Sequence, residues 1–197
     1  MKTRYLPLLF APLLLCGCSK AAYQADPNAL LGNPLYVELF ANEMVDTMVE
    51  FDIQNDPIIL DTTKKKIIDD TKKAWLIKST EAKQLQRKGI KGSFIEIKEY
   101  AEGEVLLLNN IVHFGPNFVT APGPELHAFL STVVDPRDAE TFPDATAIDV
   151  GIVRVPYGAQ SFIITQKIDD PKIYRSIALW DVKLGLLYGF AQINPMN

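Results

Sequence analysis

The spacing of apolar residues changes along this chain of 197 residues and divides it into four parts. A continuous apolar run from Leu6 to Leu15 comes first, and a polar stretch follows it. Apolar residues then recur every three or four positions, which is typical of a helix, and from Ile90 they alternate in short runs, which is typical of strands. The pattern predicts a leader over residues 1–17, a tether over 18–33, helices over 34–89 and a β domain over 90–197.

The first helix is expected to begin at Asn33 and Pro34, a capping residue followed by a proline at the first helical position. Its apolar face would consist of Val37, Phe40, Ala41, Met44, Val45 and Met48. A short helix is marginal in water on its own, so some other apolar surface must cover this face. We expect the β domain or a partner protein to supply most of that cover.

A second helix completes the expected hairpin. Asp56-Pro57 or Asp61 with Thr62 offers its start, and Gly89 offers its stop. Its apolar stripe is weaker and lies among many lysines, at Ile67, Thr71, Ala74, Trp75 and Ala82.

After Ile90 the chain has the composition of an all-β domain, with β-branched and aromatic runs bounded by Gly, Pro, Asn and Asp. Eight strands are expected, at 93–100, 103–108, 110–114, 126–132, 147–153, 160–164, 176–182 and 187–193. Eight strands in about a hundred residues favour two packed antiparallel sheets. The predicted fold class is therefore mainly β, an antiparallel β-sandwich or jelly roll preceded by an α-helical hairpin.

The start of the chain has the order of a bacterial lipoprotein signal peptide. Lys2 and Arg4 precede the apolar run, and Leu15-Cys16-Gly17-Cys18 closes it. Resemblance to bacterial lipoproteins implies cleavage before Cys18, which would then carry diacylglycerol and an N-acyl chain such as palmitate. More than one acyl chain anchors a protein stably to membrane lipid.

A transmembrane helix is the alternative interpretation of this run. The run is too short to cross about 30 Å of hydrocarbon, and Pro7 and Pro12 interrupt it. Ser19 after the acceptor cysteine resembles an outer-membrane sorting signal of Gram-negative lipoproteins. The expected location is the cell envelope, on the outer membrane facing the periplasm or the cell surface.

Composition narrows the chemistry of the mature chain. Cys16 would leave with the leader and Cys18 would be alkylated, so neither a free thiol nor a disulfide is expected. The chain has 24 acidic and 20 basic residues, and the leader would remove two of the bases. An acidic chain is a poor binder of nucleic acid, which requires clustered Lys and Arg, so no nucleic-acid partner is expected.

Several runs of the β domain occur in an order typical of one known family. Pro122 to Ser131 reads Pro-Gly-Pro-Glu-Leu-His-Ala-Phe-Leu-Ser, and Gly92-Ser93-Phe94 precedes it. Three further runs follow, at 158–164, 174–180 and 188–191. Together they resemble the DM-thirteen domain family over about residues 90–194. The resemblance implies a β domain of secreted or membrane-attached proteins, for which a role in electron transfer has been proposed.

One position departs from that family. The family has a cysteine after the tryptophan, proposed to act as a redox thiol or to hold a prosthetic group such as haem, whereas Trp180 is followed here by Asp181. A carboxylate cannot cycle between thiol and disulfide, and it is a poor haem ligand. No cofactor is therefore predicted, and haem or a metal is the alternative.

Asp181 has two interpretations. It is exposed to solvent because its strand is near an edge or its end, or it pairs with His127, the histidine of the family-like run. An imidazole in contact with a carboxylate could transfer a proton or offer two metal ligands, with Glu125 or Asp135 as a third. His113 lies in another apolar strand and is expected to be a structural histidine.

Signatures of known enzyme classes are missing from the sequence, including the nucleophile elbow, the phosphate loop and the zinc-binding helix. The sequence therefore favours a membrane-anchored, non-catalytic binding module that docks an envelope protein, a glycan or a small ligand. An electron-transfer or prosthetic-group-binding domain is the alternative.

Overall fold

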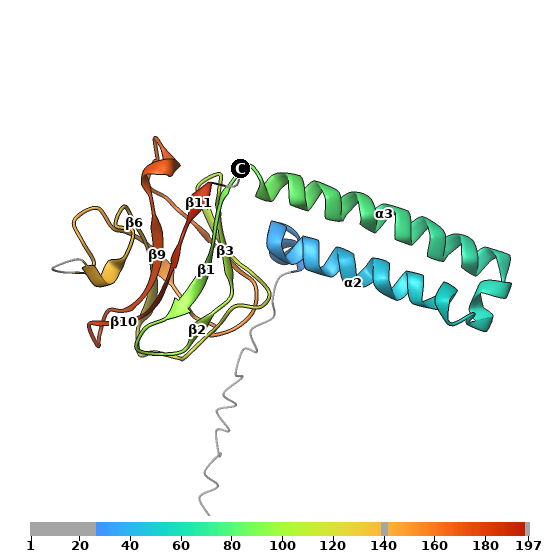
Figure 1. The fold of residues 1–197 in the computed structure, drawn as a ribbon, viewed down its shortest axis with the longest axis horizontal. Coiled ribbons are helices and arrows are strands. Elements are labelled where there is room, and N and C mark those ends of the chain that lie inside the picture. Colours follow the sequence, from blue (N-terminus) through green and yellow to red (C-terminus); the bar gives the residue numbers. More distant parts are fainter. Residues whose placement is uncertain (1–26, 139–141, 196–197) are drawn as a thin grey trace, which may run out of the picture.

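The computed structural model describes residues 27–138 and 142–195, which form a β domain and a projecting helical arm (Figure 1). The expected leader and the lipidated Cys18 lie outside the described residues. The helices are α1 (Pro27–Leu31), α2 (Pro34–Ile53), η1 (Pro57–Leu60), α3 (Thr62–Gln86), η2 (Pro136–Asp138) and η3 (Pro171–Ile173). The strands are β1 (Ile90–Glu96), β2 (Ala101–Glu102), β3 (Glu104–Leu108), β4 (Ile111–Phe114), β5 (Val119–Thr120), β6 (Leu126–Ser131), β7 (Ile148–Ile152), β8 (Gln160–Ile163), β9 (Ser176–Asp181), β10 (Leu186–Gln192) and β11 (Asn194–Pro195).

The expected helical hairpin is present as the arm, formed by α2 and α3. The side chain of Asn33 caps α2 by accepting hydrogen bonds from the backbone N–H groups of Leu35 and Tyr36. Both proposed starts of the second helix are used, because Asp56 caps η1 and Asp61 caps α3. Side-chain oxygens at these positions satisfy backbone donors that a helix leaves free at its first turn.

The buried side of α3 differs from the predicted stripe. Ile67 is 60% exposed and Ala74 is exposed, whereas Ile68 is 5% exposed. Two polar residues, Ser79 and Gln86, occupy buried positions facing α2. They form hydrogen bonds across the hairpin, and a pattern of apolar residues alone could not reveal this face.

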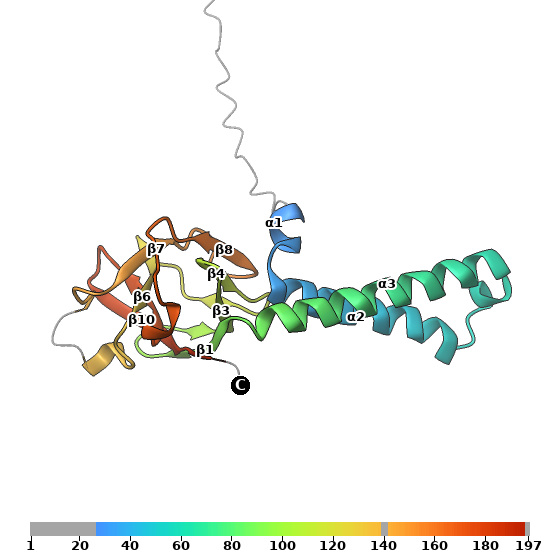
Figure 2. The ribbon, with the colours of Figure 1, turned by 90° about the horizontal axis from the view of Figure 1, so that it is seen from above.

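The main sheet of the β domain is antiparallel and curls until it is nearly closed (Figure 2), and β2 and β5 pair in a separate two-stranded sheet. Its strands follow the order β7-β6-β9-β10-β1-β3-β4-β8, and β11 also pairs with β1. Residues 90–93 of β1 pair with β3, whereas residues 94–96 pair with β10, so β1 passes from one half of the sheet to the other. The predicted mainly β, antiparallel fold after a helical hairpin is confirmed.

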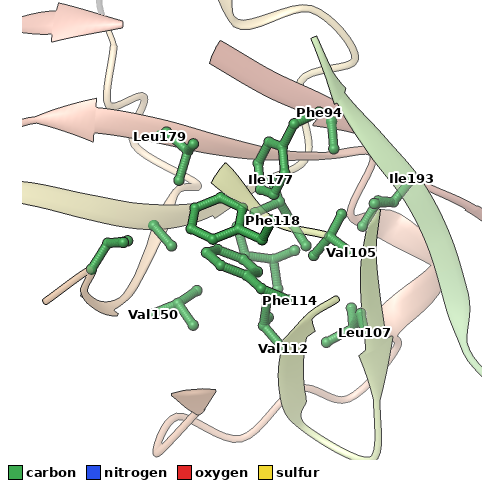
Figure 3. Close-up of a cluster of buried hydrophobic side chains, with 14 of the residues drawn as sticks. Phe94, Val105, Leu107, Val112, Phe114, Phe118, Val150, Ile177, Leu179 and Ile193 are labelled. Carbon is green, nitrogen blue, oxygen red and sulfur yellow. The ribbon is translucent and has the colours of Figure 1, made fainter. Parts of the chain in front are cut away.

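The core lies between the two halves of the sheet (Figure 3). Three phenylalanines lie at its centre. The ring centroid of Phe114 is 5.1 Å from that of Phe94 and 4.5 Å from that of Phe118. Leu179 and Val105, from opposite halves, are completely buried there. Tilted and edge-on aromatic contacts of this kind add to the stability gained by burial alone.

The arm meets the β domain at its base. The side-chain amide of Asn33 donates hydrogen bonds to the backbone carbonyls of Phe114 (2.8 Å) and Gln160 (3.3 Å). Leu35 packs on Leu106 and Leu108 of β3. Residues 27–31 of the expected tether are helical, and the rest of the arm points away from the sheet (Figures 1 and 2). Among residues 27–138 and 142–195, no helix combines the length and the apolar character needed to cross a membrane.

Candidate functional site

Asp181, which follows Trp180 at the end of β9, is a completely buried carboxylate. One oxygen accepts hydrogen bonds from the backbone N–H groups of Lys183 (3.0 Å) and Leu184 (2.9 Å), and the other accepts one from Glu125 (3.1 Å). The interpretation that Asp181 is exposed to solvent at the end of its strand is therefore wrong. The carboxylate ties the turn after β9 to the segment before β6, and its oxygens are occupied by backbone donors.

The glycine of the family-like run explains how the chain reaches this carboxylate. A Cβ atom on Gly123 would lie 2.4 Å from Oδ2 of Asp181 and 2.8 Å from the hydroxyl of Tyr188. Only a residue without a side chain can pass so close. Burial and then the negative charge of Asp181 raise the pKa of Tyr188 above its ordinary value, so this hydroxyl stays neutral.

His127 pairs with a different acid. Its Nδ1 lies 2.9 Å from Oδ2 of Asp149, on the neighbouring strand β7, and its Nε2 lies 3.9 Å from Oε1 of Glu125. Asp149 also accepts a hydrogen bond from the backbone N–H of Gly151 (2.9 Å), which fixes the carboxylate. The result is an oriented imidazole and carboxylate pair at the surface of the sheet.

His127 and Asp181 do not come together. In the pairing of β6 with β9, Leu126 stands opposite Asp181 and His127 stands opposite Trp180. Neighbouring residues of a strand point to opposite faces, so Asp181 faces the core side and His127 the outer side. The predicted pairing of these two residues is wrong. Among the described residues no three His, Cys, Asp or Glu side chains gather as a metal site, and the predicted third ligands, Glu125 and Asp135, do not complete one.

His113 has the position expected of a structural histidine. It is 3% exposed, and its Nδ1 lies 2.8 Å from the hydroxyl of Ser161 on β8. Burial lowers the pKa of His113 to about 4, so the imidazole is neutral at physiological pH. Its register partner on β3, Leu106, packs against Leu35, so His113 lies on the face of the sheet beneath the base of the arm.

A cavity of ≈ 300 Å³ lies where α1 meets the edges β7 and β8. Leu30, Ile152 and Phe162 form its apolar wall, and Arg154 and Gln160 supply polar groups. This volume is at the lower end of the range for ligand pockets, about 300–1,000 Å³.

An incompletely covered apolar surface lies on the arm, and we call it the arm face. On α2 it consists of Val37, Phe40, Met44, Met48 and Phe51, which are all half-buried. On α3 it consists of Ile67, Trp75, Lys78 and Leu85. The ring of Phe40 meets that of Trp75 at 5.0 Å, and Val37 shares a groove of ≈ 250 Å³ with Leu85. Ile67 and Leu85 are five helical turns apart and so lie on the same side of α3.

The β domain does not cover the arm face, although the sequence led us to expect either it or a partner there. Leu85 is 42% exposed and Ile67 is 60% exposed, at opposite ends of the face. Contiguous apolar surface of this kind marks interaction sites in soluble domains.

Sequence reasoning missed Asp149 and the second role of Asn33. Asp149 stands between Ile148 and Val150, so its outward direction was readable from alternation, but its strand partner was not. Asn33 was predicted as a helix cap. Nothing in the sequence showed that its side-chain amide also donates a hydrogen bond to the backbone carbonyl of Phe114 in β4.

No protein-family model, curated protein or solved structure matches this chain. The resemblance to the DM-thirteen family stays a prediction.

Proposed function

We propose that this chain is a lipoprotein of the bacterial cell envelope, anchored by membrane lipid through Cys18, and that it binds a partner protein with its arm. The β domain is the rigid base of this module. The observation that carries the proposal is the arm face, an incompletely buried apolar surface on an arm whose described contacts with the β domain, through Asn33 and Leu35, lie at its base.

The lipobox supports the anchoring part of the proposal. Pro27, the first described residue, follows Cys18 by nine positions, which an extended chain spans with at most about 30 Å. The base of the arm would therefore stay close to the bilayer. Cys18→Ala should abolish fatty-acid labelling of the protein, and normal labelling of this variant would contradict the lipid anchor.

The binding role has a direct test in intact cells. A photo-crosslinking amino acid is placed at Ile67 or Leu85 on the arm face, and at Ile173, which is 53% exposed on the β domain, as a matched control. Ultraviolet light should convert the two arm variants, but not the control, to a discrete species of higher mass. Equal patterns from all three positions would overturn the assignment of the arm as the binding element.

The titratable groups of the candidate site have structural partners among the described residues. The Asp181 carboxylate is occupied by three backbone donors, and the imidazole of His113 is buried. The His127–Asp149 pair is oriented, but no nucleophile is among its hydrogen-bond or ion-pair partners.

A further inference from the structure

The arm has an open face because it contains only two helices. Each helix of a hairpin has one neighbour, whereas each helix of a four-helix bundle has two. Phe40 and Met44, which the sequence places on the apolar side of α2, are half-buried for this reason. A second layer of two helices would complete their burial.

The two helices of the arm differ in charge. Residues 34–53 of α2 contain five acidic residues and no basic one: Glu38, Glu43, Asp46, Glu50 and Asp52. Residues 62–86 of α3 contain seven lysines and three acidic residues. Glu38 and Asp52 already pair with lysines of α3 across the hairpin. The remaining charge of the arm is acidic on α2 and mainly basic on α3, and it fits a partner with the same two charges in reverse order.

We propose that this partner is a second copy of the chain, and that two arms pack face to face as a four-helix bundle. The inference rests on the proposed function, because it names the partner that the arm binds. A homodimer with two-fold symmetry uses the same surface on both copies, and the arm face supplies an apolar surface of that kind.

Charge selects between the two ways of stacking the hairpins. If the two-fold axis crosses the arms, α2 lies against α2 of the second copy. The acids of α2 that form no ion pair among the described residues, Glu43, Asp46 and Glu50, then lie near the same acids of the other copy. If the axis runs along the arms, each α2 lies against the α3 of the other copy, and opposite charges meet. The second arrangement is the one we infer, and it places both β domains at the same end of the bundle.

This arrangement also suits two copies anchored to one membrane. Symmetry requires the two-fold axis to stand perpendicular to a bilayer that both copies share. Because the axis runs along the arms, the bundle would point away from the lipid. The anchors would enter at the base of each arm, where α1 lies (Figure 2).

The contacts between α2 and α3 fix which residues stand at the same level of the arm. The hydroxyl of Ser79 donates a hydrogen bond to Asn42 (2.7 Å). Glu43 is one residue beyond Asn42, and Lys78 is one residue before Ser79, so these two charges share a level. With the axis along the arms, Glu43 of each copy therefore stands at the level of Lys78 of the other.

Both side chains are free to make that pair. Lys78 holds its ammonium group 4.2 Å from the ring centroid of Trp75, at the arm face. Glu43 is exposed and directly precedes Met44 of the arm face in the sequence. Neither forms an ion pair within residues 27–138 and 142–195. Symmetry would create the Glu43–Lys78 pair twice in each dimer.

The test uses the chain from Ser19, which keeps every described residue, and measures its association by sedimentation over a range of protein concentrations. We expect a dimer. E43K and K78E should each raise the dissociation constant by about tenfold or more, because each brings like charges together twice. The double variant E43K/K78E should return to within about threefold of the parent, because both pairs are reformed with their signs exchanged.

The controls separate an effect on the interface from misfolding. K172E changes an exposed charge of the β domain and should leave association unchanged, and circular dichroism should show the same helix content in all variants. A spin label on Gln54→Cys, at the tip of the arm, should give a distance below about 30 Å between copies, because packed helices lie about 8–10 Å apart.

A chain that stays monomeric up to ~1 mM, where even weak complexes form, would overturn the inference. A dimer insensitive to E43K and K78E, or with tips farther apart than that limit, would also overturn it. In either case crosslinks from the arm face to a different protein would leave the proposed function standing. Loss of every arm-specific crosslink would remove the proposed function itself.

Discussion

His113 should make the stability of this protein depend on pH between 6.5 and 4. The ordinary pKa of 6.5 applies to the unfolded chain, and burial lowers the pKa to about 4 in the folded chain. Between these values the unfolded chain binds a proton that the folded chain does not, so the free energy of unfolding falls as the pH falls. The full difference corresponds to about 3 kcal/mol, and roughly 2 kcal/mol of it should be lost between pH 7 and pH 5.

Urea unfolding of the chain from Ser19 at pH 7, 6 and 5 measures this loss. The chain has only two histidines, so His127→Gln is a matched control that leaves His113 in place. The pH range in which His113 affects stability is also separate from that of Asp135. The Arg137 guanidinium holds the pKa of the Asp135 carboxyl below its usual range.

The decisive variant is His113→Gln. It should lose most of the pH dependence between 7 and 5, whatever its stability at pH 7, whereas His127→Gln should keep it. If His113→Gln shows the same slope as the parent, the imidazole is not the source of the dependence and the reasoning from burial fails. An NMR titration of the His113 ring gives an independent value of its pKa.

Three further substitutions test the contacts that hold the fold. Asp181→Ala should cost about 2–4 kcal/mol in urea unfolding, because three backbone N–H groups lose their acceptor, and a loss below about 0.5 kcal/mol would contradict its structural role. Asn33→Ala should cost about 1–2 kcal/mol and speed hydrogen exchange at the base of the arm, whereas Gln54→Ala at the tip should not. Gly123→Ala should lower the melting temperature through its clash with the buried carboxylate, and Gly32→Ala, whose added Cβ makes only ordinary contacts, should leave it nearly unchanged.

Alternation predicted the longer strands because each is long enough to show its period. Seven of the eight lie within two residues of β3, β4, β6, β7, β8, β9 and β10, namely those predicted at 103–108, 110–114, 126–132, 147–153, 160–164, 176–182 and 187–193. The eighth, at 93–100, is displaced by three to four residues from β1 (Ile90–Glu96). The strands β2, β5 and β11 have two residues each and carry no readable period. The helix starts were equally local signals, since a capping oxygen and a proline act within one turn.

The candidate site depended on information that is not local. Alternation placed Asp181 on the same face as Ile177 and Leu179 correctly, but one of its hydrogen-bond donors is the backbone N–H of Glu125, which is 56 residues away in the chain. His127 finds Asp149 only through the register of β6 with β7. An isolated sequence contains neither register, so the wrong carboxylate was assigned to the histidine.

The short connection between α3 and β1 would transmit a force on the arm to the whole β domain. Only Arg87, Lys88 and Gly89 separate the helix from the strand, and Gly89 passes so close to β3 that an added Cβ would lie 2.7 Å from a backbone oxygen there. The strand that receives this load pairs with β3, β10 and β11, and so belongs to both halves of the sheet. A pull along the arm would therefore reach both halves of the sheet through β1. A force on the arm would thus be transmitted to β1, which pairs with three other strands of the domain.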